Sequence, residues 1–256
     1  MVSKLYVNGD SHSAGAEIYT DFCCNNDDQD FHCLIQYMPN KKHLINTLGT
    51  AAHYGNLWGS YGGFLSRKLN KELVCDAVSG SSNARIYRTT MEYISKNKND
   101  FILIGWSTWE RKELIIDETD GIVQRVQITA SGTDSVPSRF QDIYKKWIAD
   151  MDKEYLIKCE KENHRVIYEL HKYLQEQNIK HYFFNTFSYF GNIPENDQYD
   201  WDDCYFHPYE QAYTFYHYLK NRNHEPNKNY HHCSNAHYEW AELLFDKLRK
   251  QCYNNE

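Results

Sequence analysis

Long hydrophobic runs are absent from this sequence of 256 residues. No apolar stretch approaches the roughly 18 residues that a membrane span requires. The N-terminus begins with a strand-like segment and lacks the apolar core of an export signal. These absences predict a protein that is not exported and has no membrane partner.

Blocks of basic residues are also absent. The net charge is −7 at pH 7, and the pI is about 6.0. A nucleic-acid-binding surface needs clustered Lys and Arg, so we expect no nucleic-acid partner.

Paired cysteines of the CxxC type are missing, although the chain has eight cysteines. Scattered, unpaired spacing favours reduced thiols over a disulfide framework, and it predicts a cytoplasmic location. The cysteines are Cys23, Cys24, Cys33, Cys75, Cys159, Cys204, Cys233 and Cys252.

Internal repeats and low-complexity tracts are absent, and the length predicts one domain over residues 1–256. Four short, apolar, β-rich segments alternate with helical patterns. This alternation predicts a mainly parallel sheet covered by helices on both faces, an α/β fold. The predicted strands are 4–8, 72–78, 100–106 and 180–186, and the predicted helices are 61–69, 83–96, 139–177 and 235–251.

Two segments interrupt this alternation and are predicted to be insertions over the site. Residues 21–57 are polar and then rich in glycine, whereas residues 112–133 have the pattern of a β-hairpin that turns at Asp120 and Gly121. Residues 191–204 are acidic and aromatic and show no clear period.

The stretch "VNGDSHSAG" places Ser11 just after the first predicted strand. A nucleophilic serine needs a strand-to-helix turn, where backbone N–H groups can stabilise developing negative charge. The alternative is an ordinary turn with a helix N-cap.

Small polar residues also follow the second and third strands. Gly80 follows the second strand, where its N–H can approach a substrate oxygen, and Ser107 follows the third. In parallel sheets ligands bind beyond the carboxyl ends of the strands, so these residues are expected at one edge with Ser11.

Four blocks together resemble the SGNH (GDSL-like) hydrolases: "GDSHSAG", "SGSSNARIYR", "GWSTWER" and "HHCSNAHYEWAELL". The second and third blocks are most similar to SGNH-like proteins of tailed phages. The resemblance implies a flavodoxin-like three-layer α/β/α domain and ester hydrolysis through an acyl-enzyme, with no cofactor and no metal.

Carried over to this chain, the resemblance makes Ser11 the nucleophile and assigns its N–H and that of Gly80 to the oxyanion hole. The family has G-x-N-D in the third block, where this chain has Ser107 and Thr108. The side-chain amide donor is therefore missing, and the Ser107 hydroxyl or the amide of Asn83 is expected to replace it. Loss of such a donor can cost roughly 3 kcal/mol of transition-state stabilisation.

The last block supplies the general base. His231 lies six residues before His237, and Trp240 and Ala241 follow His237. This spacing makes His231 the expected base. His232 and His237 are the alternatives. His237 shares a helical face with Trp240, a position typical of a packed core residue.

No carboxylate lies two or three residues before His231, where the family has one. Either the site is a Ser-His dyad, or the carboxylate comes from elsewhere. The candidates for this carboxylate are Glu225 and the group at Asp200, Asp202 and Asp203.

Two other interpretations of these residues stay open. The last block offers four metal-ligand side chains within seven residues, namely His231, His232, Cys233 and His237. Four aromatic residues could form a sugar-binding platform or pack at the rim of the site. They are Trp106, Trp109, Tyr199 and Trp201.

The expected function is therefore that of a serine esterase that deacylates a small molecule or an O-acylated carbohydrate. The alternative is a phage structural or glycan-binding protein that keeps the fold without turnover. Phage origin would place the chain in the cytoplasm of an infected cell or in the virion, with contacts to virion proteins or to copies of itself.

Overall fold

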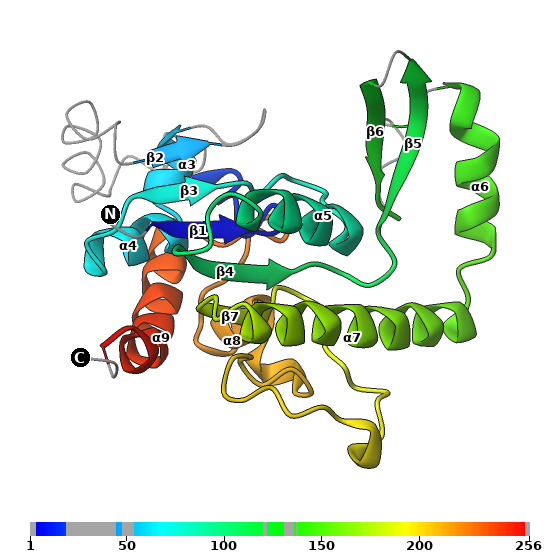
Figure 1. Cartoon of the computed structure of the whole chain (residues 1–256). Coiled ribbons are helices and arrows are strands. Elements are labelled where there is room, and N and C mark those ends of the chain that lie inside the picture. Colours follow the sequence, from blue (N-terminus) through cyan, green and yellow to red (C-terminus); the bar gives the residue numbers. More distant parts are fainter. Residues whose placement is uncertain are drawn as a thin grey trace.

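The computed structural model describes residues 4–18, 45–47, 54–119, 122–130, 136 and 138–253. Five strands among them form one parallel sheet with the order β2-β3-β1-β4-β7 (Figure 1). The strands are β1 (Leu5–Asn8), β2 (Ile45–Thr47), β3 (Leu73–Cys75), β4 (Phe101–Trp106) and β7 (His181–Asn185). The strand order reverses beside β1, which is where ligands bind in such sheets.

The side chains of alternate β1 residues point to opposite faces of the sheet. Leu5 and Val7 are buried in one apolar cluster with residues of α4 (Tyr61–Lys68), α8 (Phe215–Asn221) and α9 (Ser234–Tyr253). Tyr6 lies in a second cluster with residues of α5 (Asn83–Ile94) and α7 (Lys153–Glu176). The side-chain period of two therefore produces the three-layer α/β/α arrangement that the sequence predicts.

The hairpin that the sequence predicts is present and stands apart from the sheet with α6 (Figure 1). Its strands β5 (Lys112–Thr119) and β6 (Ile122–Ile128) are antiparallel, and α6 is Gln141–Ala149. A third apolar cluster joins them through Ile128, Val136, Tyr144 and Trp147. The turn at 120–121 lies outside the described residues.

The helix predicted over 139–177 is two helices, so that prediction is wrong. Asp150 ends α6, and the side chain of Asp152 accepts a hydrogen bond from the Tyr155 N–H at 2.7 Å to begin α7. Aspartate favours such N-caps because its carboxylate satisfies an exposed helix amide.

The sequence also missed three elements. Strand β2 forms the edge of the sheet and lies inside the segment 21–57 that we expect to be an insertion; most of that segment is outside the described residues. Short helices α3 (Tyr54–Trp58) and α8 were not predicted either. Each is too short to show a helical period. Three short 3₁₀ helices complete the described elements, at Ser138–Phe140, Glu195–Asp197 and Gln211–Tyr213.

No helix in the described part of the chain has the length and apolar character of a membrane span. Four cysteines in the described part form no disulfide: Cys75, Cys159, Cys204 and Cys233.

Candidate active site

Ser11, Gly80 and His231 line one cavity of about 350 Å³. Ser11 follows β1, Gly80 lies between β3 and α5, and His231 precedes α9. Thr129 and Ala130, which follow the hairpin strand β6, also line it. The structure thus brings Ser11, Gly80 and His231 together, and the segment that follows the hairpin borders the same cavity.

The turn after β1 requires a glycine because the chain passes close to β4. Gly9 has φ +153°, and a Cβ built on it would lie 2.7 Å from the carbonyl oxygen of Gly105 and 2.1 Å from Ser13 Oγ. Any side chain at position 9 would push β1 and β4 apart just before Ser11.

Asp10 connects the ends of three strands beneath the cavity. Its fully buried carboxylate accepts hydrogen bonds from Ser107 Oγ at 3.0 Å and Thr186 Oγ1 at 3.1 Å. Arg111 Nη1 lies 3.2 Å from the same oxygen. Burial alone would raise the pKa of Asp10, but His12 and Arg111 outweigh it and lower that pKa. Asp10 is not among the site residues that the sequence predicts, although it directly precedes Ser11.

His231 is held by the carboxylate of Glu17, a residue that the sequence did not predict for the site. Its Nδ1 lies 2.9 Å from Glu17 Oε2, six residues beyond Ser11. Because the carboxylate can only accept, the neutral ring carries its proton on Nδ1 and keeps Nε2 as the basic nitrogen. Glu225 is exposed, and Asp202 lies instead against His171, so neither takes this position.

Asn227 fixes both members of this pair. Its Nδ2 donates to Glu17 Oε2 at 2.7 Å, and its Oδ1 accepts from the His231 N–H at 3.0 Å. Asn229 Nδ2 donates to the other oxygen of Glu17 at 2.6 Å. Partial burial alone would raise the pKa of Glu17, but the hydrogen bonds from His231 and Asn227 lower it, so the carboxylate stays ionised.

Glu17 itself has a left-handed backbone, with φ 68°. A residue other than glycine adopts this conformation at a cost of order 1–3 kcal/mol. The bonds from Asn227, Asn229 and His231 offset that cost and hold the carboxylate in place.

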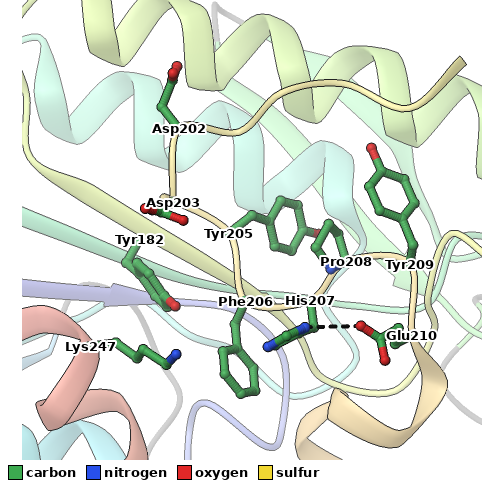
Figure 2. A pocket seen from close by; sticks show the side chains of 10 residues that line it. All are labelled: Tyr182, Asp202, Asp203, Tyr205, Phe206, His207, Pro208, Tyr209, Glu210 and Lys247. Atoms are coloured by element: carbon green, nitrogen blue, oxygen red, sulfur yellow. Dashed lines mark hydrogen bonds and ion pairs between the residues drawn. The ribbon is translucent and has the colours of Figure 1, made fainter. Parts of the chain in front are cut away.

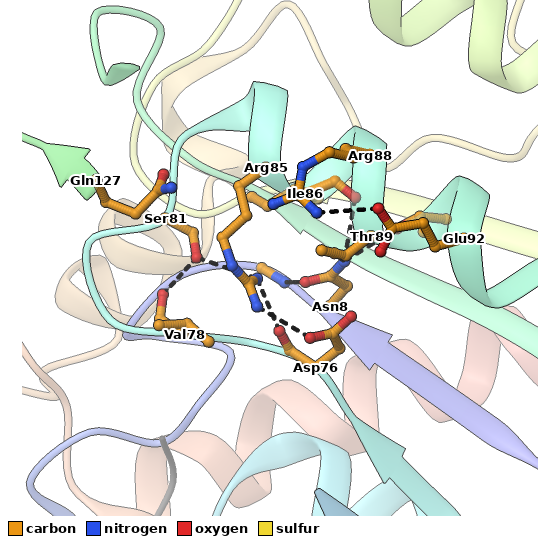
Figure 3. A network of polar contacts seen from close by, with 12 residues as sticks. Asn8, Asp76, Val78, Ser81, Arg85, Ile86, Arg88, Thr89, Glu92 and Gln127 are labelled. Carbon is orange, nitrogen blue, oxygen red and sulfur yellow. Dashed lines mark hydrogen bonds and ion pairs between the residues drawn. The ribbon is translucent and has the colours of Figure 1, made fainter. Parts of the chain in front are cut away.

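A buried polar network fixes the loop that carries Gly80 (Figure 3). The guanidinium of Arg85 donates to Asp76 Oδ1 at 3.0 Å and to the Asp76 carbonyl at 2.9 Å, while Ser81 Oγ donates to the Val78 carbonyl at 2.7 Å. The loop is therefore held on both sides of Gly80. Its φ of +77° is the left-handed conformation that favours glycine.

The backbone N–H groups of Ser11 and Gly80 are available to donate a hydrogen bond to a ligand in the cavity. No described group accepts a hydrogen bond from the N–H of Ser11 or of Gly80. Both residues border the same space, which is the arrangement that an oxyanion hole requires.

The expected side-chain donors, Ser107 and Asn83, do not serve the cavity, and this prediction is wrong. The Ser107 hydroxyl donates to Asp10 and accepts from Arg111 Nη1 at 2.7 Å. The Asn83 amide donates to the Ser107 carbonyl at 3.2 Å and to Asn163 Oδ1 at 2.9 Å, which occupies both its protons. The Asn83 side chain holds the start of α5 against the end of β4, and the Ser107 side chain holds Asp10 and Arg111.

Thr108, the next residue in the same block, fits the role better. It lines the cavity, and its buried Oγ1 has no hydrogen-bond partner among the described residues. The sequence carries a signal for it, because Thr108 directly follows Ser107 in the block "GWST".

His237 is a packed structural residue, as its helical face predicts. It is 1% exposed, stacks on the Tyr61 ring and accepts the Tyr61 N–H at Nδ1, 3.2 Å away. Tyr61 is the first residue of α4, so His237 satisfies an amide that the helix leaves without a partner. Burial lowers the pKa of His237 well below its ordinary value.

His232, the other alternative base, is 1% exposed and packs against the rings of Phe215 and Tyr216. Burial lowers its pKa to about 4. Unlike His231, it does not line the cavity.

Neither of the other two interpretations is supported. Within the described residues, the one grouping with the spacing of metal ligands is elsewhere in the fold, and it includes none of the four side chains of the last block. Of the four aromatic residues, Trp106, Trp109 and Trp201 are at most 8% exposed, and Tyr199 stacks on the Tyr168 ring. Most of their surface is buried in core packing, although Trp109 also borders a cavity.

Comparison with known proteins gives a family and several distant structures, two of which are described below. The model of a Family of unknown function (DUF6071) matches residues 42–196. No curated protein matches the chain. The acetyl xylan esterase AlAXEase is 13% identical, with a TM-score of 0.41 and an alignment that covers 95% of this chain and 98% of that one.

A second structure is the acetyl xylan esterase Est2A from the rumen bacterium Butyrivibrio proteoclasticus. It is 11% identical with a TM-score of 0.39, and the alignment covers 99% of this chain and 65% of that one. At these values neither similarity carries information about chemistry.

Proposed function

The chain belongs to this family of unknown function, DUF6071, and we propose from the geometry of its site that it is a serine esterase that deacylates an O-acylated carbohydrate. One observation carries the proposal. Ser11 and His231 share a cavity, and Glu17 orients His231 so that its basic Nε2 is available. These three residue types are those of a Ser-His-acid triad.

In the proposed reaction the Ser11 hydroxyl attacks the carbonyl carbon of the ester, and its proton passes to His231 Nε2. The imidazolium that forms is stabilised by the ionised carboxylate of Glu17. Collapse of the tetrahedral intermediate breaks the bond to the sugar oxygen, which takes the proton from His231. Water, deprotonated by His231, then hydrolyses the acyl-Ser11 bond.

The negative oxygen of the intermediate is assigned to the N–H groups of Ser11 and Gly80, with the Thr108 hydroxyl as a third donor. Their fixed positions support this assignment because donors that need no rearrangement stabilise charge best. Arg85 acts as a positioning residue, since it holds the loop on which Gly80 lies.

The surroundings of the cavity support a sugar-bearing substrate over a small ester. A second cavity of about 390 Å³ has Glu110 and Phe187 as lining residues in common with the first. Its other lining residues include Tyr189 and Gln211, a mixture of aromatic and amide side chains suited to a sugar ring. An acyl group beside Ser11 would thus leave room for further sugar units along the second cavity.

One observation favours the alternative, a glycan-binding phage protein without turnover. The third block lacks the amide donor, and Ser107 in its place is bound to Asp10. Reaction of Ser11 with an ester or with a serine-directed probe would distinguish the esterase from this alternative.

Hydrolysis of 4-nitrophenyl acetate and of an acetylated xylo-oligosaccharide, together with labelling by a fluorophosphonate probe, tests the proposal. We expect turnover and labelling of Ser11, loss of both in Ser11→Ala, and normal behaviour of Ser95→Ala, a serine at the exposed end of α5. The double variant Ser11→Ala/His231→Ala should be no worse than either single variant, because residues that act as a unit are not additive. A folded wild-type protein that neither hydrolyses any ester nor reacts with the probe would overturn the proposal in favour of the binding role.

A further inference from the structure

Tyr230 directly precedes the proposed base and lines the same cavity as Ser11 and His231. It is 61% exposed, although burial of an aromatic side chain is favourable. The Tyr230 ring meets the Tyr216 ring at 63°, with the two centroids 6.2 Å apart. Most of the surface of Tyr230 is therefore open to a molecule that enters the cavity.

The backbone of Tyr230 has a conformation that its residue type disfavours, with φ 67°. Eight described residues other than glycine have a positive φ, and six of them are asparagine, aspartate or histidine, which tolerate it best. The other two are Glu17 and Tyr230, and both belong to the Ser11 site. Strained residues of this kind cluster at sites of binding and catalysis.

A closed turn holds this strained residue in place. The Tyr230 N–H donates to the Asn227 carbonyl at 3.0 Å, and the Asn227 N–H donates to the His231 carbonyl at 2.8 Å. The Asn227 side chain also accepts from the N–H groups of Asn229 and His231, at 2.9 and 3.0 Å. The backbone of Tyr230 is thus fixed by the same residue that fixes the pair of His231 and Glu17.

Charged groups with opposite hydrogen-bonding roles line the cavity together with Tyr230. The Glu110 carboxylate can accept hydrogen bonds, and the Arg111 guanidinium can only donate them. Arg111 Nη1 is bound to Asp10 and Ser107, whereas its Nε and Nη2 make no hydrogen bond with a described residue. Sugar hydroxyls donate and accept, and the C–H face of a sugar ring packs on an aromatic ring. This combination of an open ring with a donor and an acceptor fits a pyranose better than a lipid chain.

Other aromatic residues that line a cavity do not offer such a surface. A larger cavity of about 700 Å³ lies beside β7, and Figure 2 shows the aromatic side chains among its lining residues. Tyr182, Tyr205 and Phe206 of that cavity are at most 6% exposed. Their rings are covered by protein and present little surface to a sugar. Tyr230 differs from them because it is exposed and lies beside the proposed nucleophile.

We propose that Tyr230 is the stacking platform for the sugar ring that carries the ester, and that it selects acylated carbohydrates over small esters. The inference rests on the proposed function for the place of the ester, but it concerns binding and not the chemical step. The apolar face of a pyranose covers the Tyr230 ring, and its hydroxyls bond to Glu110 and Arg111. The turn that holds Tyr230 also carries His231, so it aligns the bound sugar with the base.

Binding to the Ser11→Ala variant tests the platform without turnover. Isothermal titration calorimetry measures the Kd values of O-acetylated xylo-, gluco- and galacto-oligosaccharides. Tyr230→Asn in this background removes the ring and keeps the turn, because asparagine tolerates the left-handed conformation. We expect the Kd of the bound sugar to rise about tenfold, the effect of roughly 60 Å² of apolar surface that is no longer buried.

Two further variants in the same background serve as controls. Tyr230→Phe keeps the ring and should bind as Ser11→Ala does, because it loses only the hydroxyl. Tyr238→Ala should also bind as Ser11→Ala does, since Tyr238 lies on α9, is 46% exposed and does not line the cavity. Circular dichroism checks that each variant is folded. Tyr230→Gly, which removes both the ring and the strain, replaces Tyr230→Asn if that variant does not fold.

Equal Kd values for Tyr230→Asn and Tyr230→Phe would overturn the platform, and so would a folded Ser11→Ala variant that binds none of the three sugars. Failure of the esterase proposal is a separate result. A wild-type protein that hydrolyses no ester, but whose Tyr230 variants bind sugar in the expected order, would leave the platform supported and the catalytic role of Ser11 refuted.

Discussion

Glu17 Oε2 and His231 Nδ1 lie 2.9 Å apart although 214 positions separate the two residues in the chain. The carboxylate comes from the loop of the proposed nucleophile and not from the segment of the base. An acid that shares a loop with Ser11 keeps its position relative to Ser11, so the contact fixes the base relative to both.

Replacement of Glu17 by Gln tests this contact. We expect kcat/KM for 4-nitrophenyl acetate to fall by about 10²–10⁴, because an uncharged amide neither stabilises the imidazolium nor fixes the tautomer of His231. Glu225→Gln, an exposed change in the loop before His231, should retain wild-type activity. Equal activities of the two variants would show that the site works as a dyad.

Thr108→Val tests the third oxyanion donor. The change removes one hydroxyl at nearly constant volume, so we expect kcat to fall by about 10²–10³ with little change in Tm. Ser107→Ala is the matched change one residue away, and it should mainly lower the free energy of unfolding, by about 1–3 kcal/mol, because Asp10 loses a buried donor. Full activity of Thr108→Val would remove Thr108 from the mechanism.

Asp10→Ala should be strongly destabilising. Its carboxylate is completely buried and is paired with Arg111, and removal of one partner from a buried ion pair costs about 3–5 kcal/mol. Denaturant unfolding measures the effect. Asp142→Asn, at a fully exposed side chain, should change the free energy of unfolding by less than about 0.5 kcal/mol. A small effect at Asp10 would mean that the three strand ends do not depend on it.

Stability should fall as the pH falls from 7 to 5. Burial lowers the pKa values of His12, His164 and His232 to about 4, whereas an unfolded imidazole titrates near 6.5. Below pH 6.5 the unfolded chain therefore binds more protons than the folded chain, and the free energy of unfolding decreases toward pH 4. Each histidine contributes up to about 1.4 kcal/mol per pH unit.

Urea unfolding at pH 7, 6 and 5 measures this slope. His164→Gln should reduce the slope, because it removes one of the histidines whose pKa burial lowers. A free energy of unfolding that is constant over this range would contradict the pKa values that burial implies.

The sequence predicts the sheet well because each of its four buried strands is a short apolar run next to a helical pattern. Strand β2 escapes prediction because three residues show no period, and the break between α6 and α7 escapes because the apolar pattern continues across Asp150–Asp152.

The grouping of Ser11, Gly80 and His231 around one cavity is predictable because a motif carries each of them. Glu17 is not predictable, since its role depends on a contact between the two ends of the chain and on a backbone conformation that its residue type disfavours. The true partners of Ser107 and Asn83 likewise depend on how α5 packs against β4.

The hairpin and α6 have an apolar cluster of their own, with four buried members, separate from the two that flank the sheet. A small cluster provides less free energy against opening than a large one, so this unit should open without unfolding of the sheet. Its amides should then exchange with solvent deuterium earlier than those of β1 and β4. Because Thr129 and Ala130 belong to the end of this unit, each opening also enlarges the entrance to the Ser11 cavity. If the proposed carbohydrate esterase activity holds, access for a bulky sugar chain would be set by the local stability of the hairpin unit and not by the rigid sheet beneath it.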